Sequence, residues 1–137
     1  MAIERHLARV ADRLPRNSET FKPATDASDA VILHLWQATQ IVIDLATTAC
    51  LHFKLGVPAT YADAFRRLSD AGVIESDLAV RLGRAAGFRN VVAHAYDQLD
   101  MARVHRAASE GPHDLRAFLA NLRDRLPPAD SSSTTNH

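Results

Sequence analysis

Hydrophobic residues recur at helical spacing along most of the chain, and no segment shows the strict alternation of a strand. The first helix is predicted over residues 1–14 and ends at Pro15. Residues 16–27 are rich in polar residues without such spacing and predict a loop, which Phe21 is expected to anchor to the core. The apolar face of the first helix consists of Ile3, Leu7, Val10 and Leu14.

A long helix is predicted over residues 30–55, and its apolar side chains cover a wider arc than one packing face requires. Ser28 or Asp29 is expected to cap its start, and Gly56, with Pro58 close behind, is expected to end it. A helix with so wide an apolar arc needs two partners. It is therefore either the central helix of the bundle or divided between the bundle and a dimer surface.

Two shorter helices are predicted next. The segment 60–63, Thr-Tyr-Ala-Asp, resembles a capping box that opens a helix ending at Gly72, and Ser76 is expected to open the following helix in the same way. That following helix contains Gly83 and Gly87, each costing about 1 kcal/mol relative to Ala. These glycines indicate close packing or a local break in the helix.

The C-terminal part is predicted to form two more helices. Asp100 is expected to cap a helix over 101–109 that ends at Gly111, and Pro112 is expected to begin the last one. Pro127 and Pro128 end that last helix. The pattern predicts an all-α fold with one domain over residues 1–128 and a disordered polar tail over 129–137.

Composition agrees with one helical domain and bears on the cellular compartment. The chain has 137 residues, 47% of them hydrophobic, and only 5 Gly and 6 Pro, so it can bury a core and has few helix breakers. Cys50 is the sole cysteine, which excludes an internal disulfide, suits a reducing cytoplasm and is expected to be a small buried hydrophobe. No leader is evident, and the apolar runs are expected to stop short of membrane-spanning length.

Charge argues against a nucleic-acid binder that is held by overall charge, because 16 basic and 16 acidic residues give a net charge of zero. The distribution is nevertheless uneven. Residues 81–106 carry five arginines against Asp97 and Asp100, although helical folding can scatter these arginines over several faces. The five are Arg81, Arg84, Arg89, Arg103 and Arg106.

The stretch from Gly87 to Asp97 is the densest in reactive groups. Arg89 carries a permanent planar cation suited to phosphate, and His94 is of the residue type that most easily exchanges a proton near neutral pH. Asn90 and Tyr96 complete the group. Together these side chains are suited to phosphodiester chemistry, and no metal-binding cluster, P-loop or dinucleotide-binding turn is evident.

The pattern Arg89-Asn90, three residues, His94, one residue, Tyr96 resembles the signature of HEPN-domain ribonucleases of the HepT toxin type. The resemblance covers roughly residues 30–122. Its upstream parts are Leu35-Trp36-Gln37, Ile43-Asp44-Leu45-Ala46 and Thr60-Tyr61-Ala62-Asp63-Ala64-Phe65. It implies a HEPN-type up-and-down bundle of about five to six helices, a homodimer whose two motifs meet in one cleft, and a metal-independent endoribonuclease that needs no cofactor.

The resemblance further implies a cognate MntA-type nucleotidyltransferase antitoxin that adenylylates Tyr96 and silences the toxin. His94 would take the proton from a ribose 2′-hydroxyl, Arg89 would stabilise the phosphoryl charge, and Asn90 would orient the imidazole or hold a phosphate oxygen. On a regular helix Arg89 and His94 diverge by about 140°, whereas Arg89 and Tyr96 align. A local bend, a long reach of the arginine side chain or a second copy of the motif would bring Arg89 and His94 together, and the resemblance implies the second copy.

Each residue also has a structural alternative. Arg89 can be a surface cation, His94 a core or capping residue, and Tyr96 an amphipathic packing residue; the complete motif favours the functional interpretation. Asp44, an acid within the long apolar helix, either faces the cleft and holds Arg89 or points to solvent. The rival function is a non-catalytic dimeric helical module that partners a nucleotidyltransferase and binds nucleotide or phosphate without cleaving it.

Overall fold

The computed structural model describes residues 2–125, which form five α-helices and two short 3₁₀ helices without a strand. The all-α prediction is confirmed. The end of the predicted domain at residue 128 and the predicted tail over 129–137 lie outside the described residues. The elements are α1 (Ala2–Arg13), η1 (Ser18–Thr20), α2 (Asp26–His52), α3 (Tyr61–Asp70), α4 (Ser76–His94), η2 (Tyr96–Gln98) and α5 (Met101–Arg125).

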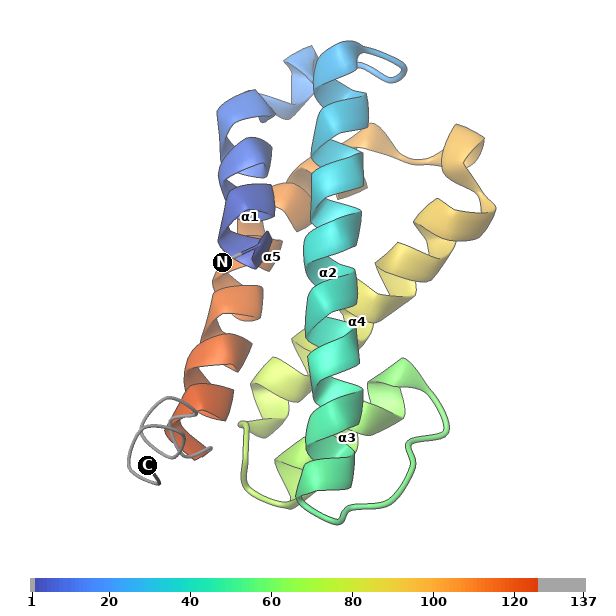
Figure 1. Ribbon diagram of the computed structural model, residues 1–137. Helices are drawn as coiled ribbons and strands as arrows, with labels where there is room; N and C mark the ends of the chain where they lie inside the picture. The colour runs from blue at the N-terminus through green and yellow to red at the C-terminus, as the bar shows by residue number, and fades with distance from the viewer. Residues whose placement is uncertain (1, 126–137) are drawn as a thin grey trace.

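Helix α2 is the central element of the bundle. It runs beside α1, contacts α3 near its lower end, and has α4 and α5 behind it (Figure 1). By length and composition alone α2 is long and apolar enough to cross a membrane. The prediction that no apolar run reaches that length is therefore wrong for α2, whose contacts with the four other α-helices account for its composition.

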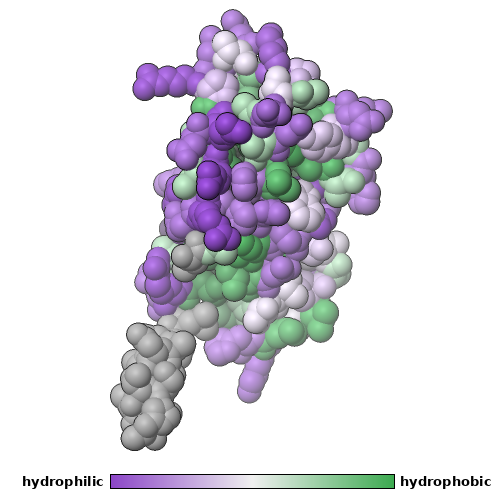
Figure 2. All heavy atoms as spheres, turned by 45° about the horizontal axis from the view of Figure 1, so that its top comes forward, coloured by the Kyte–Doolittle hydropathy of each residue, from purple (hydrophilic) through white to green (hydrophobic). Residues whose placement is uncertain are grey.

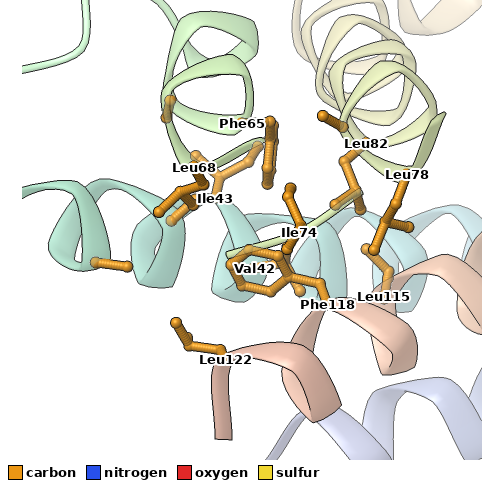
Figure 3. Packing of buried hydrophobic residues seen from close by; sticks show 14 of the residues in the cluster. Val42, Ile43, Phe65, Leu68, Ile74, Leu78, Leu82, Leu115, Phe118 and Leu122 are labelled. Atoms are coloured by element: carbon orange, nitrogen blue, oxygen red, sulfur yellow. The ribbon is translucent and has the colours of Figure 1, made fainter. Parts of the chain in front are cut away.

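The core consists of two clusters of buried side chains. The larger joins all five α-helices around Phe65 and Phe118, whose rings meet edge to face with centroids 5.7 Å apart (Figure 3). The smaller joins α1, α2, α4 and α5 around Val31 and Val104 and includes Phe21 from the predicted loop. Phe21 is 3% exposed, which confirms its predicted role as an anchor.

The predicted start of α2 is wrong, whereas the predicted cap of α3 is confirmed. Helix α2 begins at Asp26 because Thr25 is its N-cap, with the Thr25 and Ser28 side chains each accepting from the other's backbone N–H. Thr60 caps α3 by accepting from the Asp63 N–H at 2.9 Å. Ser76 is the first residue of α4 rather than its cap, and no side chain caps that helix.

The predicted break between two C-terminal helices is absent, because α5 is continuous and contains Pro112 in its interior. Pro112 lacks an N–H and costs about 3 kcal/mol relative to Ala inside a helix. The apolar face nevertheless continues on both sides of the proline, with Val104 and Ala108 before it and Leu115 and Phe118 after it, all buried. Burying this single face favours one helix over two.

The two glycines of α4 lie in different surroundings. A Cβ on Gly83 would stand 3.5 Å from the Ala62 Cβ, so α3 packs closely on α4 there, as predicted. Gly87 has no such neighbour within 4 Å, the helix continues through it, and nothing in the structure explains this glycine. Cys50 is buried, as predicted; its thiol donates to the Ala64 carbonyl, and burial raises its pKa.

Candidate functional site

The motif spans the end of α4 and the turn that follows it. In the last two turns of α4 only Val92 is fully buried; Phe88 and Arg89 are partly buried, and the other residues are exposed. The backbone leaves the helix at Ala95, Tyr96 begins η2, and the Asp100 carboxylate accepts from the Ala102 N–H at the start of α5. The motif therefore lies between the end of α4, which packs through Val92, and the start of α5, which Asp100 caps.

Arg89 turns inward, toward α2 and α3. Its guanidinium carbon lies 4.8 Å from the ring centroid of Trp36 and 5.8 Å from that of Tyr61, so the cation contacts two aromatic rings. Nη1 donates to the Asn90 side-chain oxygen at 3.1 Å, while the buried Nε has no partner among the described residues. These contacts hold the guanidinium in place and leave part of its donor capacity unused.

His94 is exposed at the last position of α4. Among the described residues no hydrogen bond or ion pair joins it to Arg89. Because α4 is helical through His94, the predicted divergence of about 140° holds: Arg89 packs on α2 and α3 while His94 points into solvent. Within a single chain, the Arg89 guanidinium and the His94 imidazole therefore lie apart.

Tyr96 is fixed to α2 instead of aligning with Arg89 along one helix, because α4 ends two residues before it. Its hydroxyl donates to Asp29 Oδ1 at 2.5 Å. The hydrogen bond to Asp29, together with partial burial, raises the pKa of Tyr96 to about 12. The phenol is thus held in its protonated form while 44% of the residue stays exposed.

Asn90 and Asp44 differ in their relation to the motif. Asn90 is exposed and contacts Arg89 as its hydrogen-bond acceptor. Asp44 is exposed and accepts from Gln40 Nε2 at 2.9 Å; it forms no ion pair with Arg89 among the described residues. Asp44 lies eight residues beyond Trp36 on α2, or about 12 Å along the helix, which places it too far along for that contact. The solvent-facing alternative fits Asp44.

The sequence alone places none of Asp29, Trp36, Gln40 and Tyr61 at the functional site, and it predicts Asp29 only as a possible cap of the long helix. The first three lie on α2 at spacings of seven and four residues, so they share one face, which contacts both Tyr96 and Arg89. Gln40 donates to Asp44, and its buried side-chain oxygen has no partner among residues 2–125. The detectable signal was a polar and aromatic stripe along an otherwise apolar helix.

The remaining histidines do not extend the site. Within residues 2–125 no group of three or more His, Cys, Asp or Glu side chains is placed to hold a metal ion. His6 and His34 share a hydrogen bond between their Nδ1 atoms at 2.9 Å, and burial followed by the His6 charge lowers the pKa of His34. His105 contacts the Pro15 carbonyl through Nε2 at 2.6 Å.

The family model described as Ribonuclease HepT-like matches residues 3–122, a span that contains the whole motif and all its contacts. The chain belongs to this family. Among curated relatives it is 28% identical over 99 residues to the mRNA nuclease HepT of Shewanella oneidensis, covering 72% of this chain and 74% of the relative. It is 31% identical over 81 residues to a putative RNase of Archaeoglobus fulgidus, covering 59% and 61% of the two chains.

Solved structures support the same assignment. The tri-AMPylated HEPN toxin of Shewanella oneidensis, in complex with the MNT antitoxin, has a TM-score of 0.80 and 25% identity, with 90% of this chain and 92% of that one covered. YutE of Bacillus subtilis, described as a cytosolic protein of unknown function, has a TM-score of 0.67 at 19% identity over 90% and 87% of the chains and shows the fold alone. The predicted resemblance to HepT-type HEPN proteins is confirmed.

Proposed function

We propose that this protein is the toxin of a toxin–antitoxin pair and acts as a metal-independent endoribonuclease. The observation that carries the proposal is the complete motif, with Arg89 held by two aromatic rings and His94 exposed, in a chain that belongs to the HepT-like ribonucleases. The mRNA nuclease name of the Shewanella relative supports RNA as the substrate.

His94 acts as the general base. It takes the proton from a ribose 2′-hydroxyl, the 2′-oxygen attacks the adjacent phosphorus, and the bond to the 5′-oxygen breaks as that oxygen takes up a proton. The products are a 2′,3′-cyclic phosphate and a 5′-hydroxyl. Arg89 stabilises the charge on the phosphoryl oxygens, while Asn90 orients Arg89 through their hydrogen bond. DNA is excluded because it lacks the nucleophile.

The active unit is a homodimer. Within one copy Arg89 packs inward and His94 points outward, so a second copy is needed to place a cation beside the imidazole. Apolar side chains near the motif support such an interface: Val91 is 42% exposed and Leu33, one turn after Asp29, is 52% exposed. Figure 2 shows hydrophobic atoms between the hydrophilic side chains on one face of the molecule.

The cognate antitoxin is an MntA-type nucleotidyltransferase that adenylylates Tyr96. Support comes from the solved relative, a tri-AMPylated toxin bound to its MNT antitoxin, and from the exposure of Tyr96. The Tyr96 oxygen passes its proton to Asp29, its hydrogen-bond acceptor, and attacks the α-phosphorus of ATP, from which pyrophosphate leaves. The added phosphate occupies the anion site beside the motif. We place the pair in the cytoplasm, in keeping with the lone buried Cys50. An unmodified Tyr96 in the mass spectrum after co-expression would contradict this assignment.

The deciding experiment is cleavage of a labelled RNA in excess chelator by the purified, unmodified protein. We expect 2′,3′-cyclic phosphate ends, and a loss of about 10²-fold or more in His94→Ala and Arg89→Ala. His113→Ala is the matched control, because His113 is also an exposed histidine but lies outside the motif. Cleavage that occurs without chelator but is lost when chelator is added would refute the metal-independent mechanism. No cleavage of varied RNAs by a folded dimer would indicate the non-catalytic binding module.

A further inference from the structure

A groove of about 290 Å³ lies between α4 and α5 and is separate from the motif. Its α4 wall carries Arg81, Arg84 and Phe88, and its α5 wall carries Arg103 and Arg106. On each helix the lining residues are spaced three or four apart, so each helix presents one continuous stripe to the groove. The floor comes from α2, where Leu35 and Thr39 are buried.

The charge of the groove is positive. Four arginines line it, against Glu110 and Asp114. Arg81 pairs with Asp114 across one end, with its Nε 3.0 Å from Oδ1. Within residues 2–125, Arg84, Arg103 and Arg106 form no ion pair, so their guanidinium groups remain available to an anionic ligand. The arginine excess of residues 81–106 therefore gathers mainly here, and only Arg89 turns to the aromatic pair.

One end of the groove lies next to the motif. Helices α4 and α5 run in opposite directions along it, since Arg81 meets Asp114 at one end while Phe88 and Arg103 line the other. Phe88 directly precedes Arg89, so that end is at the same level of α4 as the motif arginine but about 100° around the helix. A strand lying in the groove would thus approach the motif from the α5 side.

We propose that this groove binds the phosphodiester backbone of the RNA substrate and guides the strand toward the motif; the proposal rests on the ribonuclease function above. The guanidinium fork matches phosphate oxygens, and two facing rows of arginines suit a linear polyanion. This also accounts for RNA binding by a chain whose net charge is zero, because the positive charge is local.

The test measures RNA affinity in the His94→Ala background, so that the probe stays intact. A short fluorescein-labelled single-stranded RNA of mixed sequence is titrated between about 50 and 200 mM salt, with anisotropy as the readout. Adding Arg103→Gln and Arg106→Gln is expected to raise Kd at least tenfold. It should make the slope of log Kobs against log salt shallower by about 1.4, at about 0.7 per lost phosphate contact. Arg84→Gln tests the opposite wall.

The matched control is Arg5→Gln with Arg9→Gln, which removes the same charge from exposed positions of α1 outside the groove. Equal weakening by both pairs of changes would overturn the proposal, because binding would then follow total charge. Unaltered RNA affinity combined with lost binding of the purified antitoxin would also overturn it and assign the groove to the partner protein. If the parent protein neither binds nor cleaves RNA, the ribonuclease function itself is refuted. If the parent protein cleaves RNA but the Arg103→Gln, Arg106→Gln variant binds RNA with unchanged affinity, only the role of the groove is refuted.

Discussion

The two halves of α4 differ in what they contact: the first half packs in the core, and the second carries most of the motif. From Ser76 to Ala86 the helix buries four side chains in the larger core cluster, whereas from Gly87 to His94 it buries only Val92. In the first half apolar contacts decide the position of the helix. In the second half the functional groups are placed by polar and cation–π contacts to α2 and α3, with His94 left exposed. The core half thus supplies a rigid base from which the motif projects.

The largest effect is expected in the core that holds the first half. Phe118→Ala removes a buried ring that packs edge to face on Phe65, and should lower the free energy of unfolding by about 3–5 kcal/mol. His94→Ala should change it by no more than about 0.5 kcal/mol, because His94 is exposed. Urea denaturation of both variants measures the contrast. A strong destabilisation by His94→Ala would show that the two halves are not separable in this way.

Hydrophobic spacing predicts the first half of α4 and most of the bundle, because burial of apolar faces dominates their energy. It predicts the buried face of α1 and the need of α2 for more than one packing partner, but not the continuity of α5 through Pro112, where tertiary burial outweighs a local preference. Motif spacing also predicts the divergence of Arg89 and His94. Spacing within α4 does not predict that Trp36 and Tyr61 contact Arg89, since these rings come from other helices.

The second prediction concerns the aromatic contact that positions Arg89. Trp36→Leu keeps an apolar side chain but removes the ring 4.8 Å from the guanidinium, a contact worth about 0.5–2 kcal/mol. RNA cleavage should fall by about two- to thirtyfold, mainly in kcat, because the role proposed for Arg89 is to stabilise the transition state. Trp36→Phe should restore part of the activity. Equal activity of the Leu and Phe variants would contradict a positioning role for the ring.

The Tyr61 ring allows a graded version of the same test. Its centroid is 5.8 Å from the guanidinium, and Tyr61 is 36% exposed, so the contact is longer and more exposed to solvent than that of Trp36. Tyr61→Leu should therefore reduce kcat less than Trp36→Leu does. A larger loss at Tyr61 would mean that Tyr61 contributes to RNA binding in its own right, and a rise in KM would identify that contribution.

The smallest effect is expected at the hydrogen bond that fixes Tyr96 to α2. The bond to Asp29 raises the pKa of Tyr96 to about 12, above the ordinary value of 10.0. Because the folded-state pKa is the higher one, the bond contributes its full stability below pH 10 and loses it as pH rises through about 12. Asp29→Asn removes the carboxylate, so Tyr96 should titrate nearer its ordinary value, as measured by tyrosinate absorbance in a Tyr61→Phe background.

Asp26→Asn provides the control for this last change, because Asp26 is an exposed acid in the same first turn of α2 but makes no hydrogen bond to Tyr96. An unaltered titration in Asp29→Asn would show that the carboxylate does not set the pKa of Tyr96. The comparison also bears on modification. Adenylylation replaces the phenolic proton and sets a phosphate beside Asp29, so modified Tyr96 must leave its contact with α2. The motif end of α4 would then lose its tether to α2 at Asp29, while the core half would be unaffected.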